Sequence, residues 1–324
     1  MATPPFADYL VERRLLRRRL SFWRVAAFAA VATGVVILGL RLFGADGALN
    51  FTPHIARLTI NGFISGDRET LKLISKLEDS KAAAVLISID SPGGTTTGAE
   101  RLYEAIGRLS AKKPTVAVVG TLAASGGYIA ALGADQIVAQ GNSLVGSIGV
   151  LVEYPNFAKL LDIIGVKVED VKSSPLKASP NGFEPTTPEA RAALASIVDD
   201  SYAWFKDLVK RRRALSDAQL AAVDDGRVFT GRQGIGLHLV DRLGGEREAI
   251  AWLEREKSVP TGLKVRDWKA STSAARLGIF SLAARGAAFF HLDGLSALLA
   301  RGGEYADAPV LDGLVSIWQV NGAN

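Results

Sequence analysis

The chain has 324 residues, of which 48% are hydrophobic and 22% charged, so it carries enough apolar material for a sizeable core. Its net charge of +5 comes from one short segment, because residues 13–24 hold six arginines and the remainder is close to neutral. A basic excess confined to one segment argues against a nucleic-acid-binding protein. The absence of cysteine fits both oxidising and reducing compartments and excludes neither.

An uncharged run over residues 25–40 follows these arginines directly. With its flanks it reaches about twenty residues, roughly the length that crosses a ~30 Å hydrocarbon core. The run exceeds the ~7–15 apolar residues usual in a signal peptide, although cleavage within residues 45–48 is an alternative. Since six arginines precede the run and Arg41 follows it, the positive-inside rule places the N-terminus in the cytoplasm. The sequence thus predicts a basic cytoplasmic N-terminus (1–21), a transmembrane anchor (22–43) and a linker (44–53), with the rest of the chain across the membrane.

Beyond the linker, hydrophobic patterning predicts alternating strands and helices in a folded domain over residues 54–269. The continuous β-branched run over 83–89, for example, is typical of a strand that is buried on both faces. This order indicates an α/β fold with a mostly parallel sheet covered by helices on both faces. The expected strands are 54–64, 83–89, 115–120, 136–139, 144–150 and 166–171, and the expected helices are 69–77, 97–109, 129–134, 156–164 and 187–213.

The longest predicted helix begins with Thr187 as its cap and Pro188 at its first position, a common start signal. It runs to about Arg213 with an apolar stripe along one side. We expect its basic end (210–213) to be solvated, which suits the helix dipole. Residues 270–324 are expected to form a C-terminal extension that is partly helical and does not span the membrane again.

A lone serine stands between a predicted strand and a predicted helix, in the run Thr121-Leu122-Ala123-Ala124-Ser125-Gly126-Gly127-Tyr128. A hydroxyl at such a sharp turn is backed by helix N-terminal amides that can hold an oxyanion. A second run, Lys172-Ser173-Ser174-Pro175-Leu176-Lys177, supplies lysines, and burial would make a lysine neutral and able to take the serine's proton. The three histidines lie in no motif of this kind, so a serine–lysine dyad is favoured over a Ser-His-Asp triad.

The run Asp90-Ser91-Pro92-Gly93-Gly94 is predicted to end a strand with a glycine turn, where the backbone can approach a ligand closely. A plain tight turn is the alternative reading of these residues alone. The run lacks the Gly-Lys-Ser/Thr ending of a phosphate loop, and we expect no cofactor and no metal. Because the turn at Ser125 comes one strand–helix unit later, the two turns are expected to meet at the same edge of the sheet.

These motifs resemble those of the signal peptide peptidase A family, membrane-bound serine proteases whose fold is related to that of the Clp protease and crotonase superfamily. The resemblance covers residues 55–253 and implies a Clp protease/crotonase-like spiral of β-β-α units after an N-terminal transmembrane helix, with 54–269 as the peptidase domain. Besides the runs already named, the matching motifs are Ala134-Asp135, Gly146-Ser147-Ile148-Gly149-Val150 and Asp225-Gly226-Arg227-Val228-Phe229-Thr230-Gly231-Arg232-Gln233.

The resemblance also implies the role of each site residue. Ser125 is the nucleophile, and the backbone amides of Gly93 and Gly126 form the oxyanion hole. Lys177 is the general base, as in the shorter, single-domain members, and Ser147 positions that lysine. The duplicated members have their lysine in a motif closer to Lys172-Ser173, so Lys172 is the alternative base. The chain departs from the pattern at Ser174, where a glycine is common.

The function implied is a membrane-anchored serine endopeptidase that cleaves hydrophobic peptides, such as remnant signal peptides, on the periplasmic or extracytoplasmic side of the inner (plasma) membrane. The single copy of the motif set resembles members that form ring-shaped octamers with active sites shared between neighbours, so a homo-oligomer is expected. A crotonase-type acyl-CoA enzyme and a non-catalytic membrane scaffold are the alternative functions. Tyr128 is expected to pack rather than react, and Arg227 and Arg232 to make structural or intersubunit hydrogen bonds.

Overall fold

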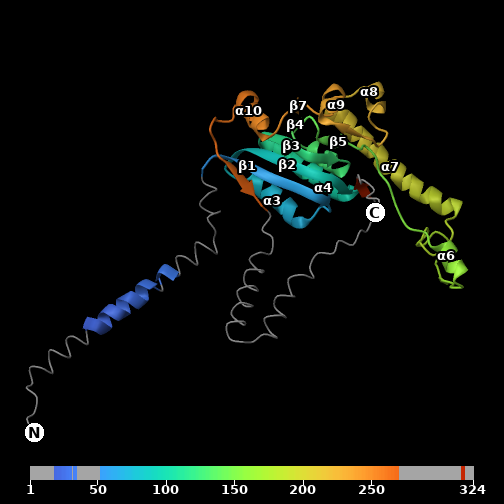
Figure 1. Cartoon of the computed structure of the whole chain (residues 1–324), viewed down its shortest axis with the longest axis horizontal. Helices are drawn as coiled ribbons and strands as arrows, with labels where there is room; N and C mark the ends of the chain where they lie inside the picture. Colours follow the sequence, from blue (N-terminus) through green and yellow to red (C-terminus); the bar gives the residue numbers. More distant parts are fainter. Residues whose placement is uncertain (1–17, 31, 35–51, 270–314, 318–324) are drawn as a thin grey trace, which may run out of the picture. The chain divides into compact units, whose positions relative to one another are not determined.

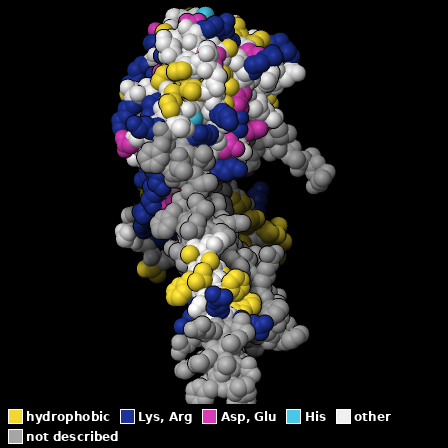
Figure 2. Space-filling view, turned by 90° about the vertical axis from the view of Figure 1, so that its left-hand side faces the viewer, with side chains coloured by type: hydrophobic (Ala, Val, Ile, Leu, Met, Phe, Trp, Pro, Cys, Tyr) yellow, Lys and Arg dark blue, Asp and Glu magenta, His cyan; other side chains and the backbone are white. Residues whose placement is uncertain are grey.

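The computed structural model describes residues 18–30, 32–34, 52–269 and 315–317, and the chain divides into two compact units, Met1–Pro53 and His54–Asn324 (Figure 1). In the first unit the described residues 18–30 and 32–34 are helical. Large apolar side chains are exposed on this helix beside basic ones, as the lower part of Figure 2 shows; they are Leu20, Phe22, Trp23, Val25 and Phe28. No helix within the described ranges combines the length and the apolar character needed to cross a membrane. Much of the predicted anchor, residues 35–43, lies outside those ranges.

The second unit is built on a sheet in which β6-β5-β3-β2-β1-β8 are successive neighbours. The pairs among β1, β2, β3, β4, β5, β7 and β8 are parallel, whereas β5–β6 and β2–β9 are antiparallel. The predicted α/β class with a mostly parallel sheet is therefore confirmed. The strands are β1 (His54–Ile64), β2 (Ala82–Thr95), β3 (Thr115–Ala124), β4 (Gln136–Ala139), β5 (Leu144–Gly146), β6 (Val228–Thr230), β7 (Arg242–Leu243), β8 (Val265–Trp268) and β9 (Val315–Ile317).

Helices cover both faces of the sheet, and alternate strand residues point to each face. In β2, Val85 and Ile87 join the cluster that packs against α3, α4, α5 and the end of α7, while Ala84 and Leu86 join the cluster beneath α10. This two-sided burial is the reason why the strand sequences are continuously apolar. The helices are α3 (Arg68–Glu78), α4 (Thr96–Lys112), α5 (Gly126–Ala131), α6 (Ala158–Ile163), α7 (Pro188–Arg213), α8 (Asp217–Ala221), α9 (Gly231–Gly236) and α10 (Glu246–Glu256).

The run Asp90-Ser91-Pro92-Gly93-Gly94 does not form the predicted turn, because β2 continues through it to Thr95. The pairing of β2 with β3 shifts register after Ile89, and its pairing with β1 shifts after Asp90, so that Gly93 pairs with Phe63 and Gly94 with Ile64. A Cβ on Gly94 would lie 1.9 Å from the carbonyl oxygen of Ile64, so only glycine permits this approach. The glycines therefore serve strand pairing rather than chain reversal.

The predicted strand over 166–171 is absent from the structure, in which this described segment has no regular secondary structure. Val166, Val168 and Val171 are exposed there, and none of the strand pairs among the described residues includes them. A β-branched run without a neighbouring strand has no hydrogen-bond partner for its backbone, so propensity alone does not make it a strand. The predicted helical part of the C-terminal extension lies outside the described residues. Within the extension, the structure describes only Val315–Ile317, which form a strand.

Helix α7 begins as predicted, since the side chain of Thr187 accepts a hydrogen bond from the backbone N–H of Ala190 at 3.2 Å. Its apolar stripe is buried only toward the C-terminal end, at Phe205 and Leu208, whereas Ile197 in its first half is exposed. Helix α6 and the chain around it lie past the first turns of α7, beyond the end of the sheet (Figure 1). We call residues 151–187 the arm.

Candidate active site

Ser125 lies directly after β3 in a backbone conformation that L-residues rarely adopt, with φ 55° and ψ −118°. Its N–H donates to the carbonyl of Gly146 at 2.8 Å, which ties the end of β3 to the end of β5. Only 1% of its surface is exposed. Such strain persists where the surrounding structure enforces it, and it is characteristic of residues at functional sites.

The two glycine-containing runs meet, as the sequence predicted. A Cβ on Gly126 would lie 3.1 Å from the nitrogen of Gly94 and 3.2 Å from the Cα of Gly93, and a Cβ on Gly127 would lie 2.6 Å from the carbonyl oxygen of Ser91. The start of α5 thus packs directly on the backbone of β2. This contact brings Ser125, which precedes Gly126, to the end of β2 where Gly93 lies.

Ser91 was not identified from the sequence as a site residue, yet it occupies the space between these backbones. Its buried hydroxyl donates to the carbonyl of Gly62 at 2.7 Å and accepts from the N–H of Gly93 at 3.1 Å. The predicted oxyanion donor Gly93 therefore has its N–H directed to Ser91 in this structure. An oxyanion would replace Ser91 Oγ as the acceptor for that N–H.

Ser147 also lies in this part of the molecule, one residue after the Gly146 carbonyl that binds Ser125. It is buried and has a positive φ of 52°. Its N–H donates to the carbonyl of Arg227 at 2.9 Å, and β5 pairs with β6 through Gly146 and Val228. The run from Asp225 to Gln233 thus holds Ser147 in place through its backbone.

The lysines lie apart from these residues, on the arm. Lys177 is exposed, whereas Ser125 is buried, and helix α6 of the arm lies beyond the end of the sheet (Figure 1). The structure therefore brings together Ser125, Gly93, Gly126 and Ser147, whereas no hydrogen bond or ion pair found among the described residues joins Lys177 to them. The burial expected to neutralise this lysine is likewise not provided by the single chain.

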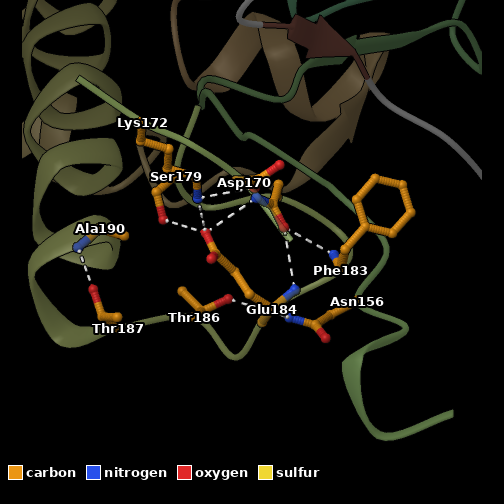
Figure 3. A network of polar contacts seen from close by, with 10 residues as sticks. Asn156, Asp170, Lys172, Ser179, Phe183, Glu184, Thr186, Thr187 and Ala190 are labelled. Carbon is orange, nitrogen blue, oxygen red and sulfur yellow. Dashed lines mark hydrogen bonds and ion pairs between the residues drawn. The ribbon is translucent and has the colours of Figure 1, made fainter. Parts of the chain in front are cut away.

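Lys172 is held by two carboxylates (Figure 3). Its Nζ lies 2.7 Å from Glu184 Oε1 and 3.3 Å from Asp170 Oδ2. Hydrogen bonding to Glu184, followed by that to Asp170, raises the pKa of Lys172 above its ordinary value, so this amine stays protonated. A protonated amine cannot accept a proton, so Lys172 in this arrangement is poorly suited to act as a general base.

Glu184 is the centre of a hydrogen-bond network that links several residues of the arm to one another (Figure 3). Besides Lys172, its Oε1 accepts hydrogen bonds from Ser179 Oγ at 3.1 Å and Asn181 Nδ2 at 3.0 Å. The hydrogen bond from Lys172, and then that from Ser179, lowers the pKa of Glu184 and keeps it ionised. Lys177 lies between two residues of this network, which thus fixes the loop that carries it.

The basic end of α7 is solvated in part, as expected, since Arg211 and Arg212 are exposed, but two of its arginines also bind the domain. Arg212 donates from Nε to the carbonyl of Leu132 and from Nη2 to that of Ala134, both at 2.7 Å. These carbonyls follow α5 directly, so Arg212 satisfies the C-terminal end of the helix that starts beside Ser125. The helical pattern shows the arginine but not which carbonyls lie within its reach.

Arg213 contributes a second link, through an ion pair with Asp241 of 2.6 Å. Burial acts to lower the pKa of Arg213, but its hydrogen bonding to Asp241 outweighs that effect and the pKa is raised. Asp241 also accepts from the N–H of Ile137 at the start of β4. The end of α7 is thereby fixed to the sheet.

Tyr128, Arg227 and Arg232, expected to pack or to make hydrogen bonds, each form a hydrogen bond within the chain. Burial raises the pKa of Tyr128, whose hydroxyl keeps its proton and donates to the carbonyl of Leu239 at 2.9 Å. Arg227 donates to the carbonyl of Ala222 at 3.2 Å, and Arg232 hydrogen-bonds the side chain of Asn142. Within the described ranges, no group of three or more acidic or histidine side chains is arranged to hold a metal ion.

Comparison with known proteins matches residues 107–260 to the model of peptidase family S49. A candidate protease of Synechocystis sp. is 39% identical over 200 residues, which cover 61% of this chain and 72% of that protein. A candidate protease of Methanocaldococcus jannaschii is 33% identical over 193 residues, or 59% of this chain and 62% of that protein. The chloroplastic serine protease SPPA of Arabidopsis thaliana is 33% identical over 195 residues, which are 60% of this chain but only 29% of the plant protein.

Two solved structures resemble the chain weakly. A ClpP1 variant from Listeria monocytogenes matches with a TM-score of 0.40 and 15% identity, over 60% of this chain and 94% of that one. A variant of the membrane-bound stomatin-specific protease 1510-N matches with a TM-score of 0.44 and 15% identity, over 68% and 99%. The sheet and helices described above, rather than these low scores, assign the chain to the α/β class.

The contact between α5 and β2 predicts opposite effects for two glycine-to-alanine changes. Gly127→Ala places a methyl group 2.6 Å from a backbone oxygen and should destabilise the fold by about 1–3 kcal/mol. Gly107 lies in α4, and a methyl group added there would meet no other atom within 4 Å, so Gly107→Ala should stabilise by roughly 0.5–1 kcal/mol. Urea unfolding of both variants measures the difference, and equal stabilities would contradict the proposed contact.

Proposed function

The chain belongs to peptidase family S49, the signal peptide peptidase A family of serine proteases, and we propose that Ser125 is its nucleophile and Lys177 its general base. The observation that carries this assignment is the strained conformation of Ser125 at the contact between two glycine-containing runs. Next to Ser125, Gly126 packs closely on the backbone of Gly93 and Gly94. That arrangement suits attack on a peptide carbonyl and stabilisation of the resulting anion.

The mechanism proposed follows from these positions. Neutral Lys177 takes the proton as Ser125 Oγ attacks the peptide carbonyl, and the N–H groups of Gly93 and Gly126 bind the oxyanion. The C–N bond then breaks, the amine leaves with the proton from the lysine, and water activated by the same lysine hydrolyses the acyl-enzyme. Loss of one oxyanion donor typically lowers the rate by a factor on the order of 10²–10³. Catalysis therefore requires that the Gly93 N–H donate to the oxyanion instead of to Ser91 Oγ.

We propose that the base for each Ser125 is Lys177 of a neighbouring chain, so that each active site is shared between two subunits of a homo-oligomer. The family resemblance favours eight subunits. The arm supports this proposal because it exposes much apolar surface, and α6 contributes no buried residue. Exposed apolar surface is a common feature of subunit interfaces. The large exposed side chains of the arm are Leu151, Phe157, Leu160, Ile163, Ile164, Val166, Val168, Val171, Leu176 and Phe183.

We also propose that residues 22–43 anchor the protein in the inner membrane, with the peptidase domain on the extracytoplasmic side. The uncharged run, the six preceding arginines and the exposed apolar side chains of the described helix support this topology. Hydrophobic peptides such as remnant signal peptides are the substrates that this location and the family resemblance favour. Family membership does not support the crotonase-type alternative, and a non-catalytic scaffold is tested by the first experiment below.

Replacement of the nucleophile should abolish activity without unfolding the chain. Ser125→Ala removes one hydroxyl from a position where an alanine side chain fits, and it should lower peptide hydrolysis by a factor on the order of 10⁴ or more. A fluorophosphonate probe should label the wild type but not the variant, whose circular dichroism should be unchanged. Equal labelling of both proteins would refute the assignment. If cells that carry Ser125→Ala kept every wild-type phenotype, a non-catalytic scaffold would be supported.

The two lysines should respond differently to substitution. Lys177→Ala and Lys177→Arg should both be inactive, because a guanidinium stays protonated and cannot accept the proton. Lys172→Ala should lose only part of the activity, since this residue holds the loop through Glu184. The exposed Lys76 of α3 provides the control, and Lys76→Ala should match the wild type. Full activity in Lys177→Ala with loss in Lys172→Ala would assign the base to Lys172.

Sharing of sites between chains predicts complementation of two inactive variants. When Ser125→Ala and Lys177→Ala chains are co-expressed in equal amounts, random assembly pairs an intact serine with an intact lysine at about a quarter of the sites. Activity of about that fraction should appear, together with fluorophosphonate labelling of the Lys177→Ala chain alone. An inactive mixture in assemblies that contain both chains would show that each site is formed within one chain.

The topology predicts where an appended reporter is active. A reporter that works only outside the cytoplasm should be active when fused after Asn50 and silent when fused after Ser21, because the proposed span separates these positions. Activity of the second fusion, or silence of the first with the protein present in the membrane fraction, would reverse the proposed orientation.

A further inference from the structure

The pairing of β1 with β2 is interrupted immediately before Gly93, the candidate oxyanion donor. At this point Gly62 of β1 and residues 91–92 of β2 have no partner across the two strands. Gly62 and Gly93 both have positive φ angles, of 68° and 112°. We call Gly62 and residues 91–92 the double bulge. Because bulged strands bend locally, the double bulge determines how the backbone enters Gly93.

The backbone of Gly93 does not hold its own orientation. Glycine adopts positive and negative φ angles about equally readily, so the residue type permits the observed conformation without enforcing it. An oxyanion hole, however, is effective because its donors are fixed before charge develops on the substrate. Another group therefore has to hold the Gly93 peptide in place.

The hydroxyl of Ser91 joins the two sides of the double bulge. It donates to the carbonyl of Gly62 at 2.7 Å and accepts from the N–H of Gly93 at 3.1 Å. The carbonyl of Gly93 is a second acceptor within its reach, but it lies farther away, at 3.5 Å. Since the hydroxyl proton is directed to Gly62, a lone pair of the oxygen is left for the Gly93 N–H.

Ser91 is itself held by the elements that carry the candidate nucleophile. It pairs with Ala123 of β3, two residues before Ser125. A Cβ on Gly127 of α5 would lie 2.6 Å from the carbonyl oxygen of Ser91 and 3.2 Å from its Cβ. The side chain is fully buried. Its hydroxyl therefore relates the position of the Gly93 N–H to that of Ser125.

We propose that Ser91 is a positioning residue of the oxyanion hole, whose hydroxyl holds the Gly93 peptide in the orientation that oxyanion binding requires. This inference rests on the proposed peptidase function of Ser125. A neutral hydroxyl is a weaker acceptor than an anion, so the forming oxyanion takes over the Gly93 N–H. Two other roles give different results. A hydroxyl that only competed with the oxyanion would slow the reaction, and a purely structural one would affect stability alone.

Ser91→Ala distinguishes these roles. The variant should lower kcat for a short apolar peptide by about tenfold or more, since complete loss of one oxyanion donor costs on the order of 10²–10³. Its KM should stay within about twofold of the wild-type value, because the lost interaction is one made in the transition state. A wild-type or raised kcat in folded Ser91→Ala would overturn the proposal.

Ser143 provides the matched control. It is also buried, and its hydroxyl likewise donates to a backbone carbonyl, that of Gly120 at 2.5 Å. Ser143→Ala should lower the stability to urea, as Ser91→Ala should, but its folded form should keep the wild-type kcat. If both variants lost kcat to the same extent, the effect would belong to any buried serine and the proposal would be wrong.

Ser91→Cys keeps a side chain of similar size and tests the same contact if Ser91→Ala does not fold. Sulfur is a weak hydrogen-bond acceptor, so kcat should fall by about threefold or more with KM unchanged. A peptide aldehyde, which forms a tetrahedral adduct with a serine nucleophile, should bind more weakly by the factor by which kcat falls. Wild-type kcat and aldehyde affinity in Ser91→Cys would overturn the proposal.

Fluorophosphonate labelling separates failure of this inference from failure of the proposed function. If Ser125 of the wild type is labelled and the peptide is hydrolysed, but the Ser91 variants keep the wild-type kcat, the inference fails and the peptidase assignment stands. If the wild type shows no Ser125-dependent labelling or hydrolysis, the peptidase assignment itself fails, and the inference about Ser91 fails with it.

Discussion

The direct contact between two backbones, at the start of α5 and the end of β2, is the constraint on which the candidate site depends. A Cβ on Gly127 would lie 2.6 Å from the carbonyl oxygen of Ser91, which leaves no room for a side chain, and a Cβ on Gly126 would lie only 3.1 Å from the nitrogen of Gly94. This contact places Ser125 at the end of the sheet and leaves it in a positive-φ conformation, while Ser91 fills the remaining space with a hydroxyl. Close packing of main chain on main chain thus fixes the relative position of α5 and β2, as complementary side chains fix the elements of an ordinary core.

Much of the fold follows from the sequence, because it depends on burial and on local capping. The continuous apolar runs become buried strands, and Thr187 and Pro188 start α7 where the pattern places it. The meeting of the two glycine-containing runs also follows, since equivalent ends of neighbouring parallel strands share one edge. These predictions are correct where the residues of a short segment are themselves sufficient to determine its structure.

The remaining features depend on partners that the sequence does not name. The run over 166–171 has the composition of a strand but no strand beside it, and Arg212 at the end of α7 donates to carbonyls near α5. Likewise, the carboxylates around Lys172 are separated from it by as many as 12 residues, so no local motif distinguishes Lys172 from Lys177. Each of these is a tertiary contact that overrides a local preference.

The network around Glu184 has a consequence for how far the lysine can travel. Lys177 is two residues from Ser179 and five from Lys172, and both of those side chains are bound to the same carboxylate oxygen. With a maximum of ~3.3–3.6 Å per residue, the backbone of Lys177 stays within about 7 Å of Ser179. Any serine served by this lysine must therefore come to the arm, because the loop is too short to reach a distant one. The spacing between neighbouring subunits, and not the flexibility of the loop, would set whether a site is complete.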